Sequence, residues 1–211
     1  MALRSDRNQW GSAIKALHWL IFLMIVVLAT VGWYMKGLPN SPDKIKVYAL
    51  HKSFGLTLLA LVVLRLAWRE LVDRVRPPLP PGMPAWQRFG AHASHLALYL
   101  LLFAIPLSGW LFNSAANFPL RWFGLFSVPS LSGPDPALKA FAGGAHWWLF
   151  WVLVVVLAAH VGAALWHHFV VRDEVLRRMW PGTRAHGSLA SRDEPVDVAA
   201  PPATTIPEET P

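Results

Sequence analysis

Histidines at regular spacing in a long apolar segment are the residues of this 211-residue chain best suited to chemistry. His146 and His160 lie in the segment 143–172, GGAHWWLFWVLVVVLAAHVGAALWHHFVVR. On an α-helix their separation corresponds to about 21 Å of rise and to about 40° less than four turns, so both imidazoles point the same way at two depths. His167 continues this stripe. Ionisable residues inside a membrane helix are costly and usually functional, so the stripe predicts a functional site.

The elements that position these histidines are four apolar segments, each long enough to cross a bilayer. They explain why 55% of the residues are hydrophobic and only 15% are charged. We expect an all-α, integral membrane four-helix bundle in one domain of residues 1–180. The first segment is too long for a signal peptide, contains His18 and lacks a small-residue cleavage site. The helices are expected at about 14–35, 48–69, 90–112 and 144–171. The composition of residues 181–211 predicts a disordered cytoplasmic tail.

Basic residues predict the orientation of the bundle, because cytoplasmic loops are enriched in Lys and Arg. They are more numerous on the side of both termini, which we therefore expect in the cytoplasm, with the chain a multi-pass membrane protein; the family resemblance given below implies the inner membrane of a bacterium. The net charge of +7 is read as a topology signal, and nucleic acid is not an expected partner. The terminal side carries Arg4, Arg7, Lys15, Arg69, Arg74, Arg76, Arg88, Arg172, Arg177, Arg178, Arg184 and Arg192, and the outer side Lys36, Lys44, Lys46, Lys52, Arg121 and Lys139.

This topology assigns a depth to each histidine. His51 and His146 fall on the outer side, and His18 and His160 on the inner side. A b-type haem needs two axial imidazoles from facing helices with an apolar slot between them. The absence of cysteine excludes covalently attached c-type haem and thiolate iron–sulfur clusters. The pattern therefore predicts two haem b groups, stacked about 20 Å apart, with their irons held by these four histidines.

Several other polar residues near these depths can be interpreted in two ways. Arg65 follows His51 by 14 residues and lies near the inner haem, where a haem propionate would be its partner; alternatively it snorkels to the surface. His167 is either a catalytic residue that donates a proton to a quinone carbonyl, or an interfacial histidine. For His92 and His95 an interfacial position is favoured over contact with propionates or quinone. His168 is expected to face lipid headgroups, and His186 receives no role.

Two other uses of intramembrane histidines were weighed. A zinc or copper site needs three or four ligands that converge on one point, whereas this spacing separates them. A transporter with a histidine proton relay would normally be larger and would contain repeats.

Several motifs together resemble the bacterial di-haem cytochrome b561 family, which is related to the cytochrome b subunits of nickel–iron hydrogenases and formate dehydrogenases. The resemblance spans about residues 6–181. It is carried by HW at 18–19, HKSFG at 51–55 with Arg65, HLALYLLLFAIPLSGW at 95–110, and LWHHFVVRDEVLRRMWP at 165–181. It implies that the haem ligands are His18, His51, His146 and His160, and that His167 is the histidine next to the quinone.

The chain looks most similar to the short, free-standing members of this family, one type of which is a superoxide oxidase. The resemblance implies an enzyme that oxidises superoxide outside the membrane and reduces ubiquinone. The basic residues of the outer side would attract a small anion, or they are ordinary solvated lysines.

The alternative function is a membrane-anchor cytochrome b that relays electrons between a periplasmic redox protein and quinone. Apolar residues of the 113–142 connection are then a docking surface, or equally a lid over the outer haem: Phe118, Trp122, Phe123 and Phe126. A haem-free transporter and an ascorbate-dependent reductase are more distant readings.

Overall fold

A computed structural model describes residues 2–7, 9–80 and 82–182 of the chain. Four helices form the body of the molecule, and each is long and apolar enough to cross a membrane. The expected all-α membrane bundle is thus confirmed, and the chain is a multi-pass membrane protein. The expected disordered tail, with His186, lies outside the described residues from position 183 onward.

All four helices begin before the bounds expected from hydropathy. They are α1 (Ser12–Gly37), α2 (Pro42–Ala67), α3 (Ala85–Ala115) and α4 (Pro136–Trp166). Single π-helical turns continue α2 as η1 (Trp68–Val72) and α4 as η2 (His167–Val171). The early starts of α2 and α4 have a local cause. Ser41 and Asp135 cap these helices by accepting backbone N–H groups, and a proline occupies the first helical position after each cap.

The helices pack around a narrow apolar core. The most extensive contact is between α3 and α4, while α1 packs on α2 and α2 packs on α3. The outward faces remain apolar, with exposed side chains such as Leu23, Leu100 and Val155, as a lipid-facing surface requires. All four helices contribute to the core cluster, which consists of Ile21, Ile25, Leu58, Val62, Leu101, Leu102 and Leu153.

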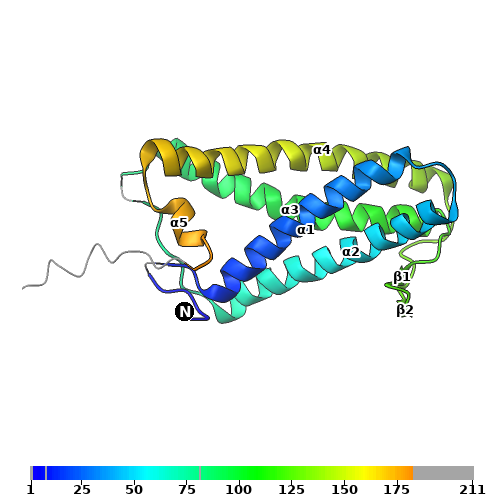
Figure 1. The fold of residues 1–211 in the computed structure, drawn as a ribbon, viewed down its shortest axis with the longest axis horizontal. Helices are drawn as coiled ribbons and strands as arrows, with labels where there is room; N and C mark the ends of the chain where they lie inside the picture. Colours follow the sequence, from blue (N-terminus) through cyan, green and yellow to red (C-terminus); the bar gives the residue numbers. More distant parts are fainter. Residues whose placement is uncertain (1, 8, 81, 183–211) are drawn as a thin grey trace, which may run out of the picture.

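The two ends of the bundle differ (Figure 1). One end carries a short antiparallel hairpin of β1 (Arg121–Trp122) and β2 (Phe126–Ser127) and is called the hairpin end. The other carries the N-terminus and the short helix α5 (Val175–Met179) and is called the terminus end. The sequence predicted neither the hairpin nor α5, because both are short and depend on contacts with the bundle.

Hydrogen bonds between distant segments close the terminus end. Asp73, which is buried after η1, accepts the backbone N–H of Ser5 at 2.9 Å and its hydroxyl at 2.7 Å. The indole N–H of Trp19 donates to the carbonyl of Met179 in α5 at 2.8 Å. The N-terminal segment, the connection after α2 and α5 are therefore fixed around the ends of α1 and α4, where His18 and His167 lie.

Candidate haem-binding sites

Four of the predicted site residues meet as two pairs of facing imidazoles. His51 of α2 faces His146 of α4, with 6.4 Å between the ring centroids. His18 of α1 faces His160 of α4, with 6.5 Å between the centroids. Helix α4 thus contributes one histidine to each pair, and its rise separates the two pairs by about 21 Å. The depth assignment made from the sequence produced the same two pairs.

The separation within each pair fits a metal ion held between two imidazoles. With metal–nitrogen bonds of about 2.1 Å and each ring centre about 1.1 Å behind its nitrogen, the two centroids lie roughly 6.4 Å apart. Both observed separations match this value. In both pairs the two rings are thus separated by the distance expected of two imidazoles that hold one metal ion between them.

Glycines provide the room for the pair at the hairpin end. A Cβ atom on Gly32 of α1 would lie 3.1 Å from Cε1 of His51, and one on Gly109 of α3 would lie 3.1 Å from Cε1 of His146. Such contacts are tighter than most real Cβ contacts. Both imidazoles of this pair therefore pack against bare helix backbone.

A backbone carbonyl orients the ring of His146. Its Nδ1 lies 2.9 Å from the carbonyl oxygen of Ile105 and 3.2 Å from the hydroxyl of Ser108, both in α3. A ligand histidine usually donates its second ring N–H to such a group, which fixes the tautomer and the ring plane. Donation from Nδ1 to Ile105 leaves Nε2 as the nitrogen available to a metal.

The pair at the terminus end has a third histidine beside it. His95 of α3 lies 5.1 Å from His160 between ring centroids, which is shorter than the spacing that an intervening iron requires. His18 therefore fits the position opposite His160, and His95 lies beside the pair. His95, for which an interfacial position was favoured, is therefore in ring contact with the terminus-end pair. His92 is exposed, and its Nδ1 lies 2.7 Å from the carbonyl of Arg88.

Buried polar atoms next to the terminus-end pair suit an anionic ligand. The guanidinium carbons of Arg65 and Arg69 each lie 5.8 Å from the ring centroid of Tyr99, which is one turn after His95. The Nε atom of Arg65 and the hydroxyl of Tyr99 are buried and have no hydrogen-bond partner among the described residues, whereas Nε of Arg69 lies 3.4 Å from Oε1 of Glu70. Buried polar groups normally have partners, so the carboxylates of haem propionates fit this cluster.

Of these three residues the sequence identified only Arg65. Arg69 follows Arg65 by one helical turn and therefore shares its face, a signal that was available. It was read instead as a topology determinant.

His167 lies in a turn at the terminus end, with a carboxylate that the sequence analysis did not include. Its Nδ1 lies 2.5 Å from Oδ2 of Asp173, and both side chains are largely buried, with 12% and 14% exposed. The other carboxylate oxygen accepts the N–H of Val175 at 3.0 Å. Arg172, with a left-handed backbone (φ 59°), reverses the chain after η2 and brings Asp173 back to His167. The neighbouring ring of His168 packs on Phe169.

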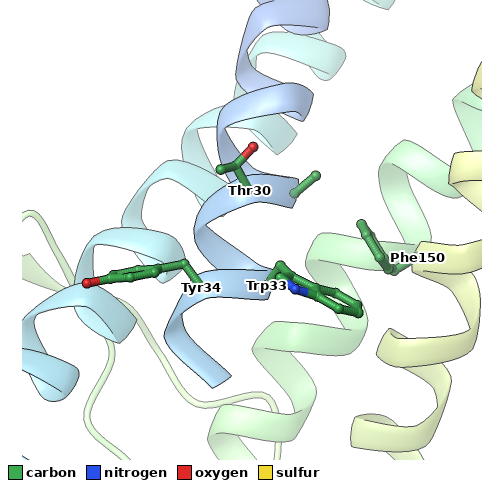
Figure 2. Close-up of a pocket in the computed structure, with 5 residues that line it drawn as sticks. Thr30, Trp33, Tyr34 and Phe150 are labelled. Carbon is green, nitrogen blue, oxygen red and sulfur yellow. The ribbon is translucent and has the colours of Figure 1, made fainter. Parts of the chain in front are cut away.

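An aromatic groove of about 470 Å³ lies between α1 and α4 towards the hairpin end. Figure 2 shows Trp33 of α1 pointing towards Phe150 of α4 across this groove, with Thr30 and Tyr34 on the α1 side. Phe150 follows His146 by about one turn and lies on nearly the same face of α4. The groove therefore adjoins the His51–His146 pair and gives it apolar, aromatic surroundings.

Comparison with known proteins places these sites in context. The family model for prokaryotic cytochrome b561 matches residues 9–182. The chain is 38% identical over 181 residues to cytochrome b561 homolog 2 of Escherichia coli (strain K12), an alignment that covers 85% of this chain and 95% of that protein. It is 29% identical to cytochrome b561 homolog 1 of the same organism, over 82% of this chain and 98% of the homolog. It is 28% identical to the probable superoxide oxidase CybB of Yersinia pestis, over 80% of this chain and 93% of that protein.

The glycine contacts lead to a prediction about cofactor content. In Gly109→Ala the added methyl group would meet the ring of His146 at 3.1 Å. We expect this variant to lose haem from the hairpin end, because the ring must leave the position in which it faces His51. Gly162→Ala is the matched control, since nothing lies within 4 Å of a Cβ at this helical glycine. Haem per chain, measured as the pyridine haemochromogen, checks the prediction. Equal haem contents in the two variants would contradict it.

Proposed function

The chain belongs to the prokaryotic cytochrome b561 family, whose members bind b-type haem and transfer electrons across membranes, and we propose that it oxidises superoxide and reduces ubiquinone through two haems. The observation that carries this proposal is the pair of facing imidazoles repeated at two depths of α4. When bound, the haems would supply the one-electron chemistry that the side chains of this cysteine-free chain lack. Binding the haems, attracting the donor and moving protons would be the roles of the protein's side chains.

The ligand assignment follows from the spacing of the rings. His51 and His146 would hold the haem at the hairpin end, and His18 and His160 the haem at the terminus end. Arg65, together with Tyr99, would bind the propionates of the latter, which gives the buried Nε of Arg65 and the buried hydroxyl their partners. Arginine suits this role because its planar fork matches a carboxylate.

The orientation of the bundle follows from its basic residues. The terminus end carries the larger number of Arg and Lys side chains, so it would face the cytoplasm of a bacterial inner membrane. The hairpin end would then face the periplasm. Superoxide would arrive at the hairpin end, and quinone would be reduced at the terminus end.

Support for superoxide as the donor comes from a relative and from the charge at the hairpin end. The Yersinia pestis relative is named a probable superoxide oxidase. Several basic residues near this end have local partners: the ammonium of Lys36 lies 3.5 Å from the centroid of the Trp147 ring, and Lys46 pairs with Asp43. Lys52 is adjacent to His51, and its ammonium is held by Asn113 Oδ1 at 3.0 Å. A fixed positive charge beside the His51 pair would attract a small anion.

At the opposite end, His167 would exchange a proton with the quinone. Asp173 accepts the Nδ1–H of His167, so Nε2 is the nitrogen left to act on a quinone oxygen. The carboxylate also stabilises the ring when it carries a second proton. Each superoxide gives up one electron and becomes dioxygen without needing a proton. Ubiquinone takes up two electrons and two protons, which would come from the cytoplasm, and becomes ubiquinol.

The reaction itself can be tested on purified protein with its haem bound. We expect xanthine with xanthine oxidase, a superoxide source, to reduce the haem, and added ubiquinone to reoxidise it. The absorption of the reduced haem reports both steps, and superoxide dismutase should abolish the first. Haem that remains oxidised under superoxide, yet is reduced by a periplasmic redox protein, would identify a membrane-anchor cytochrome that relays electrons from that protein.

The ligand pairs make a separate prediction about stoichiometry. We expect His160→Ala to lower the haem content from about two to about one per chain, because the terminus-end haem loses an axial ligand while the His51–His146 pair is untouched. His95→Ala is the matched control, since His95 lies beside His160 but too close to be the opposite ligand. Loss of one haem in His95→Ala with full content in His18→Ala would show that the pairing is wrong.

Because His167 would act only on the quinone, its substitution should slow the reduction of ubiquinone and leave the oxidation of superoxide unchanged. We expect His167→Gln to slow reoxidation by ubiquinone by about 10²- to 10⁴-fold, the usual contribution of a positioned acid–base group. Asp173→Asn, which keeps the shape but weakens the orientation of the ring, should slow it by about 10- to 100-fold. Reduction by superoxide should be unchanged in both.

His168→Gln is the control for these variants, because its ring packs on Phe169. Stopped-flow absorption measures each step separately. Reoxidation at the wild-type rate in His167→Gln would remove His167 from the quinone reaction, whatever the donor proves to be.

A further inference from the structure

The β1–β2 hairpin is fixed to α2 by two hydrogen bonds and by the ring of Phe123, which packs on Phe54 at 5.1 Å between centroids. The hydroxyl of Ser53 accepts the backbone N–H of Phe123 at 3.0 Å, and the indole of Trp122 donates to the hydroxyl of Thr57 at 3.1 Å. Ser53 and Thr57 lie about 200° and 240° around the helix from His51.

The hairpin contacts α2 well inside its apolar span. Helix α2 and its π-turn together have 31 residues, or about 46 Å, so only about 8 Å at each end extend beyond a centred hydrocarbon layer of about 30 Å. Ser53 and Thr57 lie about 16 and 22 Å from the start of the helix at Pro42. Figure 1 shows the hairpin beside α2, set back from the tip of the bundle. Its strands would then lie at the depth of a lipid layer centred on α2.

The outward surface of the hairpin is apolar. Leu125 is 72% exposed and Phe126 is 56% exposed, and Phe118 before β1 is 54% exposed. Two backbone hydrogen bonds close the hairpin, from Leu125 N–H to Trp122 O at 2.9 Å and from Val128 N–H to Leu120 O at 2.8 Å. Paired backbone groups and apolar side chains are the conditions under which a segment enters lipid.

We propose that the hairpin is a membrane wedge, with Leu125 and Phe126 inserted among the lipid acyl chains of the leaflet at the hairpin end. The partner is lipid because the wedge continues the lipid-facing surface of α2 at the same depth. Arg121, exposed on β1, lies within reach of headgroup phosphates. The wedge also stabilises the loop that holds Lys52, since Asn113 binds the Lys52 ammonium and donates to the carbonyl of Phe118.

Single-cysteine labelling tests this wedge directly, because the natural chain has no cysteine. Leu125→Cys, labelled with a nitroxide in vesicles of phosphatidylethanolamine and phosphatidylglycerol, should collide more with dissolved oxygen than with a water-soluble nickel complex. Asp43→Cys, at a side chain that is 82% exposed near the start of α2, should show the reverse order. Electron paramagnetic resonance measures both accessibilities on the full-length protein with its haem bound.

Two other outcomes would contradict the insertion of the hairpin into lipid. A Leu125 label that collides mainly with the nickel complex lies in water. A label shielded from both reagents is covered by protein, which would favour a partner or a second copy of the chain. Ser53→Ala supplies a second measurement, since loss of its hydroxyl should raise the mobility of the Leu125 label without changing haem content. Unchanged mobility would show that Ser53 does not fix the hairpin.

Discussion

An imidazole inside a lipid-embedded bundle is costly, and its ring nitrogens normally have partners. Helix α4 carries two such rings on nearly one face, and each faces a second ring at the distance that one metal ion between them requires. This constraint explains why α1 and α2 each carry one histidine that faces a histidine of α4. It also explains the role of α3, which provides the Ile105 carbonyl that orients His146 and the glycine that admits its ring.

The main features predicted from the sequence are those with a local signal. Four apolar segments and a 14-residue histidine spacing follow from hydropathy and helical periodicity alone, and the topology then pairs His51 with His146 and His18 with His160. The helix ends were less well predicted, because hydropathy does not register a cap such as Asp135 followed by Pro136. Those caps are nevertheless visible in the sequence once helix-start signals are considered.

The features that were missed depend on how distant segments rotate and fold back. The facing of His95 towards His160 is set by the rotation of α3 against α4, and no spacing within α3 reveals it. Asp173 reaches His167 only because Arg172 adopts a left-handed conformation after a π-turn. The hairpin is fixed by Ser53 and Thr57, which read in the sequence as unremarkable small polar residues of a membrane helix.

The two ends of the bundle differ in the side chains that surround their histidine pairs. Around His51 and His146 the contacts are glycine backbone, one carbonyl and aromatic rings, with Lys52 as a fixed charge nearby. Around His18 and His160 the groups are titratable or hydrogen-bonding: His95, Arg65, Arg69 and Tyr99, with His167 and Asp173 beyond them. A donor such as superoxide releases only an electron, whereas a quinone needs protons as well. The His167–Asp173 pair at the terminus end can supply protons to a quinone, and this favours the proposed direction of electron flow.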